Sequence, residues 1–288
     1  MELTNGVTVV VGPTAVGKTE YAHNLARLYS APIVSADSRQ VYSGMSVGTA
    51  APSPRLRREV EYHFVQTISP GVVYSAREFA DEALRLIGRW MAEGREHVLV
   101  VGGSMLYVRA LLYEMDPIPQ LSPTVRTEVR QLYEKNGLEA IRQELLRVDP
   151  DYLEKVDPNN YRRLLRALEV FRGTGRAFSS FHTGRLRHFN FPLRLVVLER
   201  ERSLLYDRID SRVDEMMNEG LLDEVRALRP YRSTSALQTI GYRECFSYLD
   251  GAIDLEECKR LIRKNTRTLA RQQDRFFRKL PGAELVEI

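Results

Sequence analysis

The composition of the chain is that of a folded globular protein: of 288 residues, 43% are hydrophobic and 28% are charged, and the net charge is +4. These proportions exclude a disordered chain, and no apolar run approaches the roughly 18 residues that a membrane-spanning helix needs. The first residues carry no secretory signal and the two cysteines form no Cys-x-x-Cys pair, so we expect a cytoplasmic protein without membrane contact, disulfide framework or zinc site.

The positive charge is concentrated in two segments. Residues 158–198 contain eight arginines and one glutamate, and residues 259–279 contain nine lysines or arginines and one aspartate. Because the whole chain carries only +4, everything outside these segments is net acidic. This asymmetry is typical of a protein that presents local basic surfaces to a polyanion.

Three segments in the first part of the chain have the pattern of strands buried on both faces. "VTVVVG" at 7–12 is a β-branched run that ends in glycine, and shorter runs follow at 31–38 and 97–103. Apolar residues at helical spacing predict helices at 18–29 and 76–93. This alternation predicts an α/β fold, a doubly wound parallel sheet with helices on both faces.

The pattern changes at "DPIPQLSP" (116–123), where three prolines exclude a continuous helix or a central strand. Helices and loops are favoured from there until "PLRLVVLER" (192–200) restores a buried strand. We therefore expect a core that begins in 1–115, an inserted helical subdomain at 116–192, and a last part at 193–288 with the return strand. The expected C-terminal helices are 203–219, 236–249 and 254–279.

The segment "GPTAVGKT" fits the P-loop pattern G-x-x-x-x-G-K-[ST] and lies between a predicted strand and a predicted helix, as that motif requires. Its backbone N–H groups would cradle phosphate oxygens, the lysine would add a full charge, and the threonine hydroxyl could hold Mg²⁺. The alternative is a glycine-rich turn without a ligand. The residues are Gly12, Pro13, Thr14, Ala15, Val16, Gly17, Lys18 and Thr19.

One acidic residue follows a predicted strand near this loop. Asp37, in "SADSRQ", would lie in the crevice where open α/β sheets bind ligands, whereas "HVLVVGGS" ends in glycines instead of a Walker-B aspartate. Asp37 could serve as a metal ligand or as a base, or it could only cap the next helix. The glycines before Ser104 would allow the backbone to approach a ligand at the same sheet edge.

The two basic segments have different characters. In 159–191, arginines alternate with aromatic residues, a mixture that suits RNA phosphates and unstacked bases, although Leu164, Leu165 and Leu168 have the spacing of a packed helix face. In the last helix, cations recur every four residues and form one stripe that is either a phosphate-backbone footprint or a solvated face. The stripe consists of Arg263, Arg267, Arg271, Arg275 and Lys279.

The chain resembles the tRNA dimethylallyltransferases, also called tRNA isopentenyltransferases, and the resemblance runs nearly from end to end. It rests on motifs in a fixed order: "GPTAVGKT", "SADSRQVYSGMSVGTA", "YHFVQTISPGVVYSAREF", "VVGGSMLY", "RRLLRALEVF", "LYDRIDSRVDEMMNEGLLDEV", "QTIGYRE" and "TRTLARQQDRFFR". The chain lacks the cysteine pairs of the zinc-finger extension of eukaryotic relatives and so looks like the bacterial form.

The resemblance implies an activity and a P-loop NTPase-like fold. The loop, although of the ATP-binding type, would hold dimethylallyl diphosphate, and the enzyme would move the dimethylallyl group to N6 of the adenine on the 3′ side of the anticodon, with Mg²⁺ and without consuming ATP. The tRNA anticodon stem-loop would be the partner, and we expect a monomer.

The family's site residues map onto positions of this chain. Asp37 matches the general base, and Arg109 and Arg212 match basic positions near the diphosphate; Arg212 could also be a surface residue of an amphipathic helix. The positions that match tRNA contacts are Asp37, Ser38, Arg39, Gln40, Ser104, Arg126, Arg162, Arg163, Leu164, Leu165 and Arg166, to which the stripe adds Arg267 and Arg271.

Some positions depart from the family pattern: Ala51 stands where a lysine is usual, Gln66 where an aspartate is common, and Ser104 where threonine is usual.

Three other functions remain open on the residues alone. They are a small-molecule P-loop kinase, a transferase acting on free adenine nucleotides, and a non-catalytic RNA-binding protein. An intact Lys18, Thr19 and Asp37 disfavour the last of these.

Overall fold

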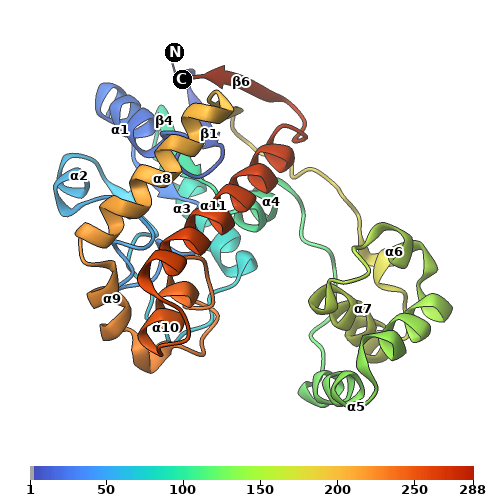
Figure 1. Cartoon of the computed structure of the whole chain (residues 1–288). Coiled ribbons are helices and arrows are strands. Elements are labelled where there is room, and N and C mark those ends of the chain that lie inside the picture. The colour runs from blue at the N-terminus through green and yellow to red at the C-terminus, as the bar shows by residue number, and fades with distance from the viewer. Residues whose placement is uncertain (1–2) are drawn as a thin grey trace. The chain divides into compact units, whose positions relative to one another are not determined.

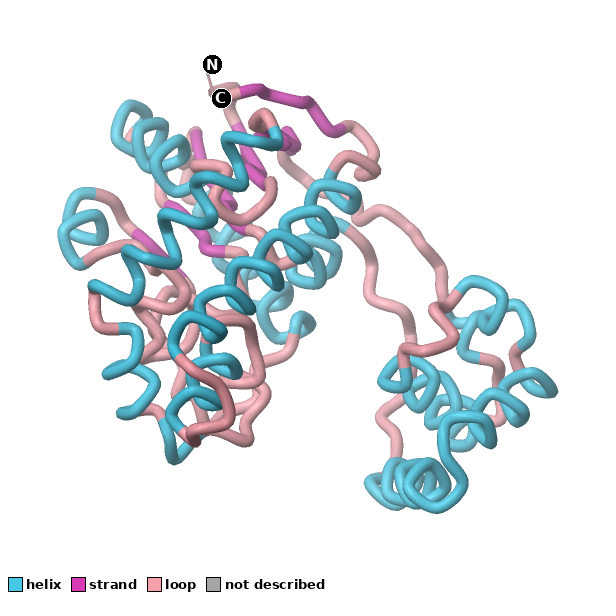
Figure 2. Tube along the Cα trace, in the orientation of Figure 1, coloured by secondary structure: helices cyan, strands magenta, loops and turns pink. Residues whose placement is uncertain are grey.

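The computed structural model describes residues 3–288 and divides into two compact units. The first comprises the chain up to Leu112 together with His188–Ile288, and the second comprises Tyr113–Arg187. The strands of the sheet belong to the first unit, whereas the second consists of helices joined by loops (Figure 2). The sequence analysis expected the helical insertion at 116–192, and the observed second unit is Tyr113–Arg187.

A six-stranded parallel sheet forms the centre of the first unit (Figure 1). Its order is β3-β2-β4-β1-β5-β6, so the strand that precedes the P-loop is flanked on both sides. Buried valines fill β1, as the continuous apolar run predicts. The strands are β1 (Gly6–Val11), β2 (Ile33–Ser35), β3 (Tyr62–His63), β4 (His97–Gly102), β5 (Leu193–Glu199) and β6 (Ala283–Glu287).

The described residues of the first unit form eight α-helices. Some of them pack against the sheet, and others form a second apolar cluster. One core cluster packs residues of α1, α8 and α11 onto the sheet, and the other joins α8 to α11. The helices are α1 (Lys18–Tyr29), α2 (Pro54–Glu59), α3 (Ala76–Ala92), α4 (Met105–Leu112), α8 (Arg202–Asn218), α9 (Leu221–Ala227), α10 (Tyr242–Leu249) and α11 (Leu255–Phe277).

The second unit has a small core of its own. It contains α5 (Pro123–Val148), α6 (Pro150–Lys155) and α7 (Tyr161–Thr174), and Leu164 and Leu168 of α7 are fully buried against α5. Asp149 ties the unit together, because its carboxylate caps α6 and accepts bonds from the backbone N–H and hydroxyl of Ser179. No helix in the described part of the chain is both long and apolar enough to cross a membrane.

Several predicted boundaries differ from the observed ones. The helix expected at 236–249 begins only at Tyr242, and Gly241 before it has φ +90°, which favours glycine. Ala236 and Leu237 are fully buried without being helical, so the apolar spacing there reflects the core. Strands β3 and β6 and helices α2 and α9 were not predicted.

The two cysteines carry no disulfide, as expected. Cys245 of α10 and Cys258 of α11 are buried free thiols whose Sγ atoms lie 3.9 Å apart. The hydrogen bond between them and their burial raise the pKa of the Cys245 thiol. They pack the last two helices together.

Candidate active site

The P-loop lies between β1 and α1, as its motif predicts. Gly17, the residue before the helix, has φ +115°. Ala15, two residues earlier in the loop, also has positive φ. A side chain at Gly17 would be strained by this backbone and would approach Ile288 to 3.1 Å. The loop therefore needs glycine where its backbone turns into the helix.

Lys18, the first residue of α1, folds back over the loop. Its Nζ donates to the carbonyl oxygens of Gly12 at 2.9 Å and Pro13 at 2.7 Å. The pKa of the Lys18 ammonium is lowered from 10.5 to about 8, mainly by burial. The negative charge of Asp37 opposes this shift, and the positive charge of Arg212 adds to it. A poorly hydrated cation at this position is suited to take up an anion.

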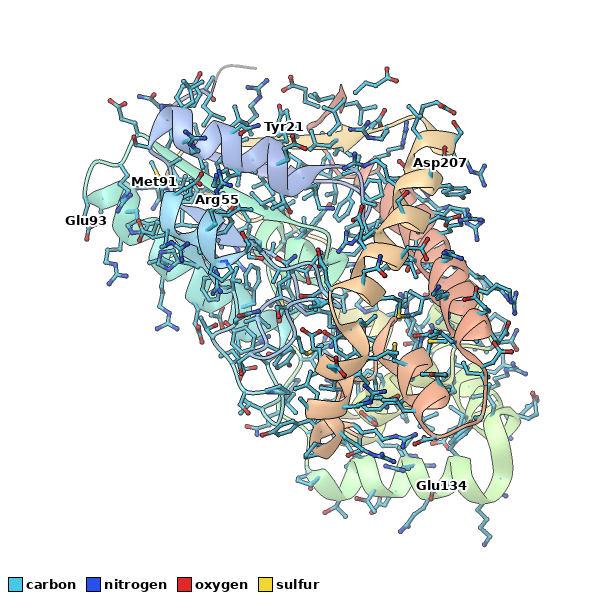
Figure 3. All side chains as sticks on the ribbon, turned by 60° about the vertical axis from the view of Figure 1, so that its left-hand side comes forward. Tyr21, Arg55, Met91, Glu93, Glu134 and Asp207 are labelled. Atoms are coloured by element: carbon cyan, nitrogen blue, oxygen red, sulfur yellow. The ribbon has the colours of Figure 1, made fainter. Side chains whose placement is uncertain are left out.

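A cavity of about 550 Å³ opens over the loop and brings most of the predicted catalytic groups together. Lys18, Thr19, Asp37 and Arg212 line the same space. Asp207, labelled on α8 in Figure 3, stands at its wall. The complete lining is Thr14, Ala15, Gly17, Lys18, Thr19, Glu20, Asp37, Gln40, Thr49, Ala50, Asp207, Arg208, Ser211, Arg212 and Glu215.

Arg212 of α8 points into this cavity, so it is not the surface residue that the helical pattern also allowed. Its Nη1 donates to the hydroxyl of Thr14 at 3.5 Å and its Nη2 to the carbonyl of Thr49 at 3.3 Å. Its Nε is buried without a partner among the described residues. Burial lowers the pKa of the Arg212 guanidinium, and the negative charge of Asp37 opposes this shift only in part. Arg109, in contrast, is exposed on α4 and does not line the cavity.

Asp37 caps a turn and also lines the cavity. Its Oδ1 accepts the backbone N–H groups of Arg39 at 2.8 Å and Gln40 at 3.3 Å, which caps the turn after β2. The same carboxylate lines the cavity opposite Lys18 and Arg212. The turn therefore fixes the direction of a carboxylate that faces the phosphate-binding loop.

The other residues after β2 are engaged within the protein. The Arg39 guanidinium donates to the carbonyl of Ser235 at 2.8 Å, and the amide of Gln40 donates to the carbonyls of Thr49 and Ala50, both at 3.2 Å. Ser104, the expected helix cap or polar contact, accepts the N–H of Ser38 at 2.7 Å and donates to its hydroxyl at 3.0 Å. Of these residues only Gln40 lines the cavity, and their predicted contacts with tRNA remain predictions.

Gln273 of α11 was missed by sequence reasoning although it touches the P-loop. Its Oε1 accepts the N–H of Thr14 at 2.8 Å and its Nε2 donates to the carbonyl of Gly103 at 2.8 Å. The side chain is only 5% exposed. A Cβ at Gly103 would lie 2.7 Å from the Gln273 amide, which explains the glycine there. The motif "TRTLARQQDRFFR" contains this residue but gives no sign of its contact.

The predicted RNA-binding residues of the second unit divide by exposure. Arg126 of α5 and Arg162 and Arg163 of α7 are exposed, and Arg166 pairs with Glu169 at 3.3 Å. Leu164 has no exposed surface and belongs to the core, with Leu165 half-buried beside it, as the helical spacing of these leucines indicated. The predicted contact of this stretch with tRNA remains a prediction. Exposed arginines on a helix remain suited to phosphate contacts.

The cationic stripe of α11 is not uniform. Arg263 binds the carboxylate of Asp214 at 2.6 and 2.8 Å, and Arg267 pairs with Asp210, so both arginines join α11 to α8. Arg271 is exposed and donates to the hydroxyl of Thr268. Arg263 and Arg267 therefore also have a structural role between the two helices, and the predicted contact of the stripe with RNA remains a prediction.

The order of the sheet and the loop at the carboxyl end of β1 define a P-loop α/β protein, and the carboxylate and buried cations around the loop are those of an enzyme that handles phosphate esters. A model of the IPP transferase family matches residues 40–280. The chain belongs to this family, whose members are prenyltransferases, which confirms the resemblance drawn from its motifs.

Relatives and solved structures agree with this assignment. The chain is 44% identical over 271 residues to tRNA dimethylallyltransferase 1 of Porphyromonas gingivalis, covering 94% of this chain and 90% of that protein. It resembles the full-length tRNA isopentenylpyrophosphate transferase of Bacillus halodurans with a TM-score of 0.71 and 34% identity, over 98% and 90% of the two chains. A eukaryotic dimethylallyltransferase acting on tRNA gives 0.83 and 25% identity, over 99% and 74%.

Replacing Gln273 by leucine should disturb the P-loop. The substitution leaves the N–H of Thr14 and the carbonyl of Gly103 without their partners, and a shift of the loop by about 1 Å can cost about 10²-fold in activity. We expect the KM for the diphosphate donor to rise at least about tenfold while RNA affinity stays unchanged. Gln272→Leu, at the exposed neighbouring position, is the matched control; equal donor KM values in the two variants would contradict the role of Gln273.

The lowered pKa of Lys18 predicts how anion binding depends on pH. Below about pH 8 the ammonium is charged and binds an anion; above it the free protein loses this proton, so binding must take a proton up. The affinity for inorganic diphosphate should fall by up to about tenfold per pH unit above pH 8. Calorimetry in buffers of different ionisation enthalpy measures the uptake. The fall should be absent in Lys18→Arg, and a wild-type fall that begins near pH 10 would contradict the prediction.

Proposed function

We propose that this protein transfers a dimethylallyl group from dimethylallyl diphosphate to N6 of the adenine on the 3′ side of the anticodon in tRNA, giving N6-isopentenyladenosine and diphosphate. One observation carries the proposal: Lys18 and Arg212, which suit a diphosphate, line the same cavity as Asp37, which suits an amine's proton. The relatives named tRNA dimethylallyltransferase support the same reaction.

The cations act on the leaving group. When the bond between C1 of the prenyl group and the diphosphate oxygen breaks, negative charge develops on the diphosphate and positive charge on the allylic carbons. Lys18, Arg212 and the backbone N–H groups at the start of α1 stabilise that negative charge, and they are held in place before the reaction. Their effect is larger in the transition state than in the bound donor.

Asp37 acts on the acceptor. The lone pair of adenine N6 is delocalised into the ring, so the amine attacks C1 well only if it loses a proton as the N–C bond forms. The Asp37 carboxylate accepts that proton and diphosphate leaves, which balances the reaction. General-base help of this kind is typically worth about 10² to 10⁴ in rate.

The residues present fit a magnesium ion. Thr19 places a hydroxyl in the cavity, and Mg²⁺ is usually bound by one or two protein oxygens together with phosphates and waters. When bound, Mg²⁺ would neutralise charge on the diphosphate.

RNA is the acceptor in this proposal. The adenine must leave its stack to reach Asp37, which costs a few kcal/mol and is offset by protein contacts to the surrounding nucleotides. Exposed Arg126, Arg162 and Arg163 in the second unit suit the backbone of the anticodon stem-loop. A kinase or a transferase of free nucleotides would not need these exposed arginines of the second unit for its substrate.

A transfer assay separates these functions. Labelled dimethylallyl diphosphate and Mg²⁺ are incubated with the protein and a tRNA whose anticodon is followed by adenine, with AMP or ATP offered in parallel. We expect label in tRNA alone. Label in AMP but not in tRNA would favour the transferase of free nucleotides, and phosphoryl transfer from ATP would favour the kinase.

Asp37→Ala should slow the chemical step by at least about 10²-fold because the acceptor proton then has no base. The same variant should bind the anticodon stem-loop nearly as tightly as the unmodified protein. Single-turnover transfer with the donor in excess measures the step, and the stem-loop is titrated separately. An unchanged single-turnover rate would remove Asp37 as the base.

A further inference from the structure

A turn of the first unit, residues 46–50, contributes to the wall of the cavity over the P-loop. Thr49 and Ala50 line the cavity, and the carbonyl oxygen of Thr49 accepts from Nη2 of Arg212 at 3.3 Å. The side-chain amide of Gln40 donates to the same oxygen at 3.2 Å. The backbone of the 46–50 turn therefore orients the Arg212 guanidinium, and a group that fixes the turn also fixes this cation.

One carboxylate, that of Glu224 on α9, holds the turn. Its Oε2 accepts the backbone N–H of Ser46 at 2.8 Å and that of Val47 at 2.7 Å, and its Oε1 accepts the N–H of Gly48 at 2.9 Å. The hydroxyl of Ser46 also donates to Oε2, at 3.0 Å. Successive N–H groups that converge on one anion form a nest, and the residue that follows this nest in the chain is Thr49.

Tyr242 of α10 binds the same carboxylate. Its hydroxyl donates to Oε1 of Glu224 at 2.7 Å, and its side chain is fully buried. Burial and the negative charge of Glu224 raise the pKa of the phenol, so it stays protonated and remains a donor. A Cβ on Gly48 would lie 2.7 Å from the Tyr242 ring, so a larger residue at 48 would push the turn away from Glu224.

Glu224 is firmly anchored and does not line the cavity. Leu221 and Val225, which flank it on α9, are fully buried in an apolar cluster that also contains Val41 and Met45. The residues that line the cavity over the P-loop do not include Glu224. Its effect on the bound substrates must therefore pass through the turn.

The turn can transmit this constraint because it is closed by hydrogen bonds of its own. The hydroxyl of Thr49 donates to the carbonyl of Met45, and the N–H of Ala51 donates to the carbonyl of Ser46 at 3.0 Å. A short segment closed in this way moves as one piece. A shift of its N–H groups away from α9 would displace the Thr49 carbonyl as well.

We propose that Glu224 is a positioning residue for the transfer reaction: by holding the 46–50 turn, it places the Thr49 carbonyl that orients Arg212. The inference rests on the proposed function, because it takes the departing diphosphate as the group that Arg212 stabilises. A displacement of about 1 Å at a residue remote from the chemistry can cost about 10²-fold in rate.

The test is a double-mutant cycle between Glu224 and Arg212. Glu224→Gln keeps the size of the side chain but replaces one acceptor oxygen by an NH₂ group, which cannot accept the N–H groups that it would face. The substitution is made in the wild-type chain and in Arg212→Gln. Asp223→Asn, the same chemical change at the exposed neighbouring residue of α9, is the matched control. Calorimetry with inorganic diphosphate, single-turnover transfer to tRNA and thermal unfolding are measured for each variant.

We expect Glu224→Gln to lower the affinity for diphosphate about tenfold and the single-turnover rate at saturating donor about 10²-fold in the wild-type chain. In Arg212→Gln the same substitution should change the diphosphate affinity by no more than about twofold, because the guanidinium through which it acts is gone. Asp223→Asn should change neither quantity by more than about twofold. Equal losses in both backgrounds would show a merely structural role and overturn the proposal, as would an unchanged diphosphate affinity in Glu224→Gln.

Tyr242→Phe provides a second, milder variant if Glu224→Gln does not fold. It keeps the buried ring and removes one bond to Glu224, so the diphosphate affinity should fall less, by about threefold, and only where Arg212 is present. A loss of the same size in Arg212→Gln would overturn the inference. The binding measurements need no RNA: wild-type protein that binds diphosphate without transfer to tRNA would overturn the proposed function, whereas additive losses in the cycle would overturn this inference alone.

Discussion

The site depends on how the P-loop backbone is held from outside. The N–H of Thr14 bonds to Gln273, the carbonyl of Ala15 accepts from Arg208, and that of Val16 accepts from Arg200. These partners come from the end of β5, from α8 and from α11, which lie more than 180 residues further along the chain. A loop with positive φ at Gly17 and three external bonds has little freedom left, so its lysine and its helix N-terminus are preorganised.

The C-terminal helices therefore contribute more than cover for the sheet. α8 supplies Arg212 to the cavity and Arg208 to the loop, and the bonds from Arg263 and Arg267 to its two aspartates fix α8 against α11. A half-buried ion pair of this kind is worth little as a source of stability. Its value here is geometric, because it sets where α11 carries Gln273.

The sequence predicted the parts of the site that are local. The P-loop follows from eight consecutive residues and their position between strand and helix, α1 was placed at 18–29 as observed, and Asp37 follows from the end of a buried strand. β6 could not be predicted because its side chains are half-buried or exposed without the alternation of a strand, and Gln273 could not because its contact spans the chain. The family resemblance supplied Arg212, whose helix alone allowed a surface position.

Gln273 joins α11, the last helix of the first unit, to the phosphate loop and to Gly103. A displacement of this helix on binding of RNA would reach the P-loop backbone through Gln273. Thermodynamic reciprocity then applies: the factor by which the nucleic acid changes the donor's affinity equals the factor by which the donor changes the nucleic acid's. Any such coupling would pass through a single amide side chain.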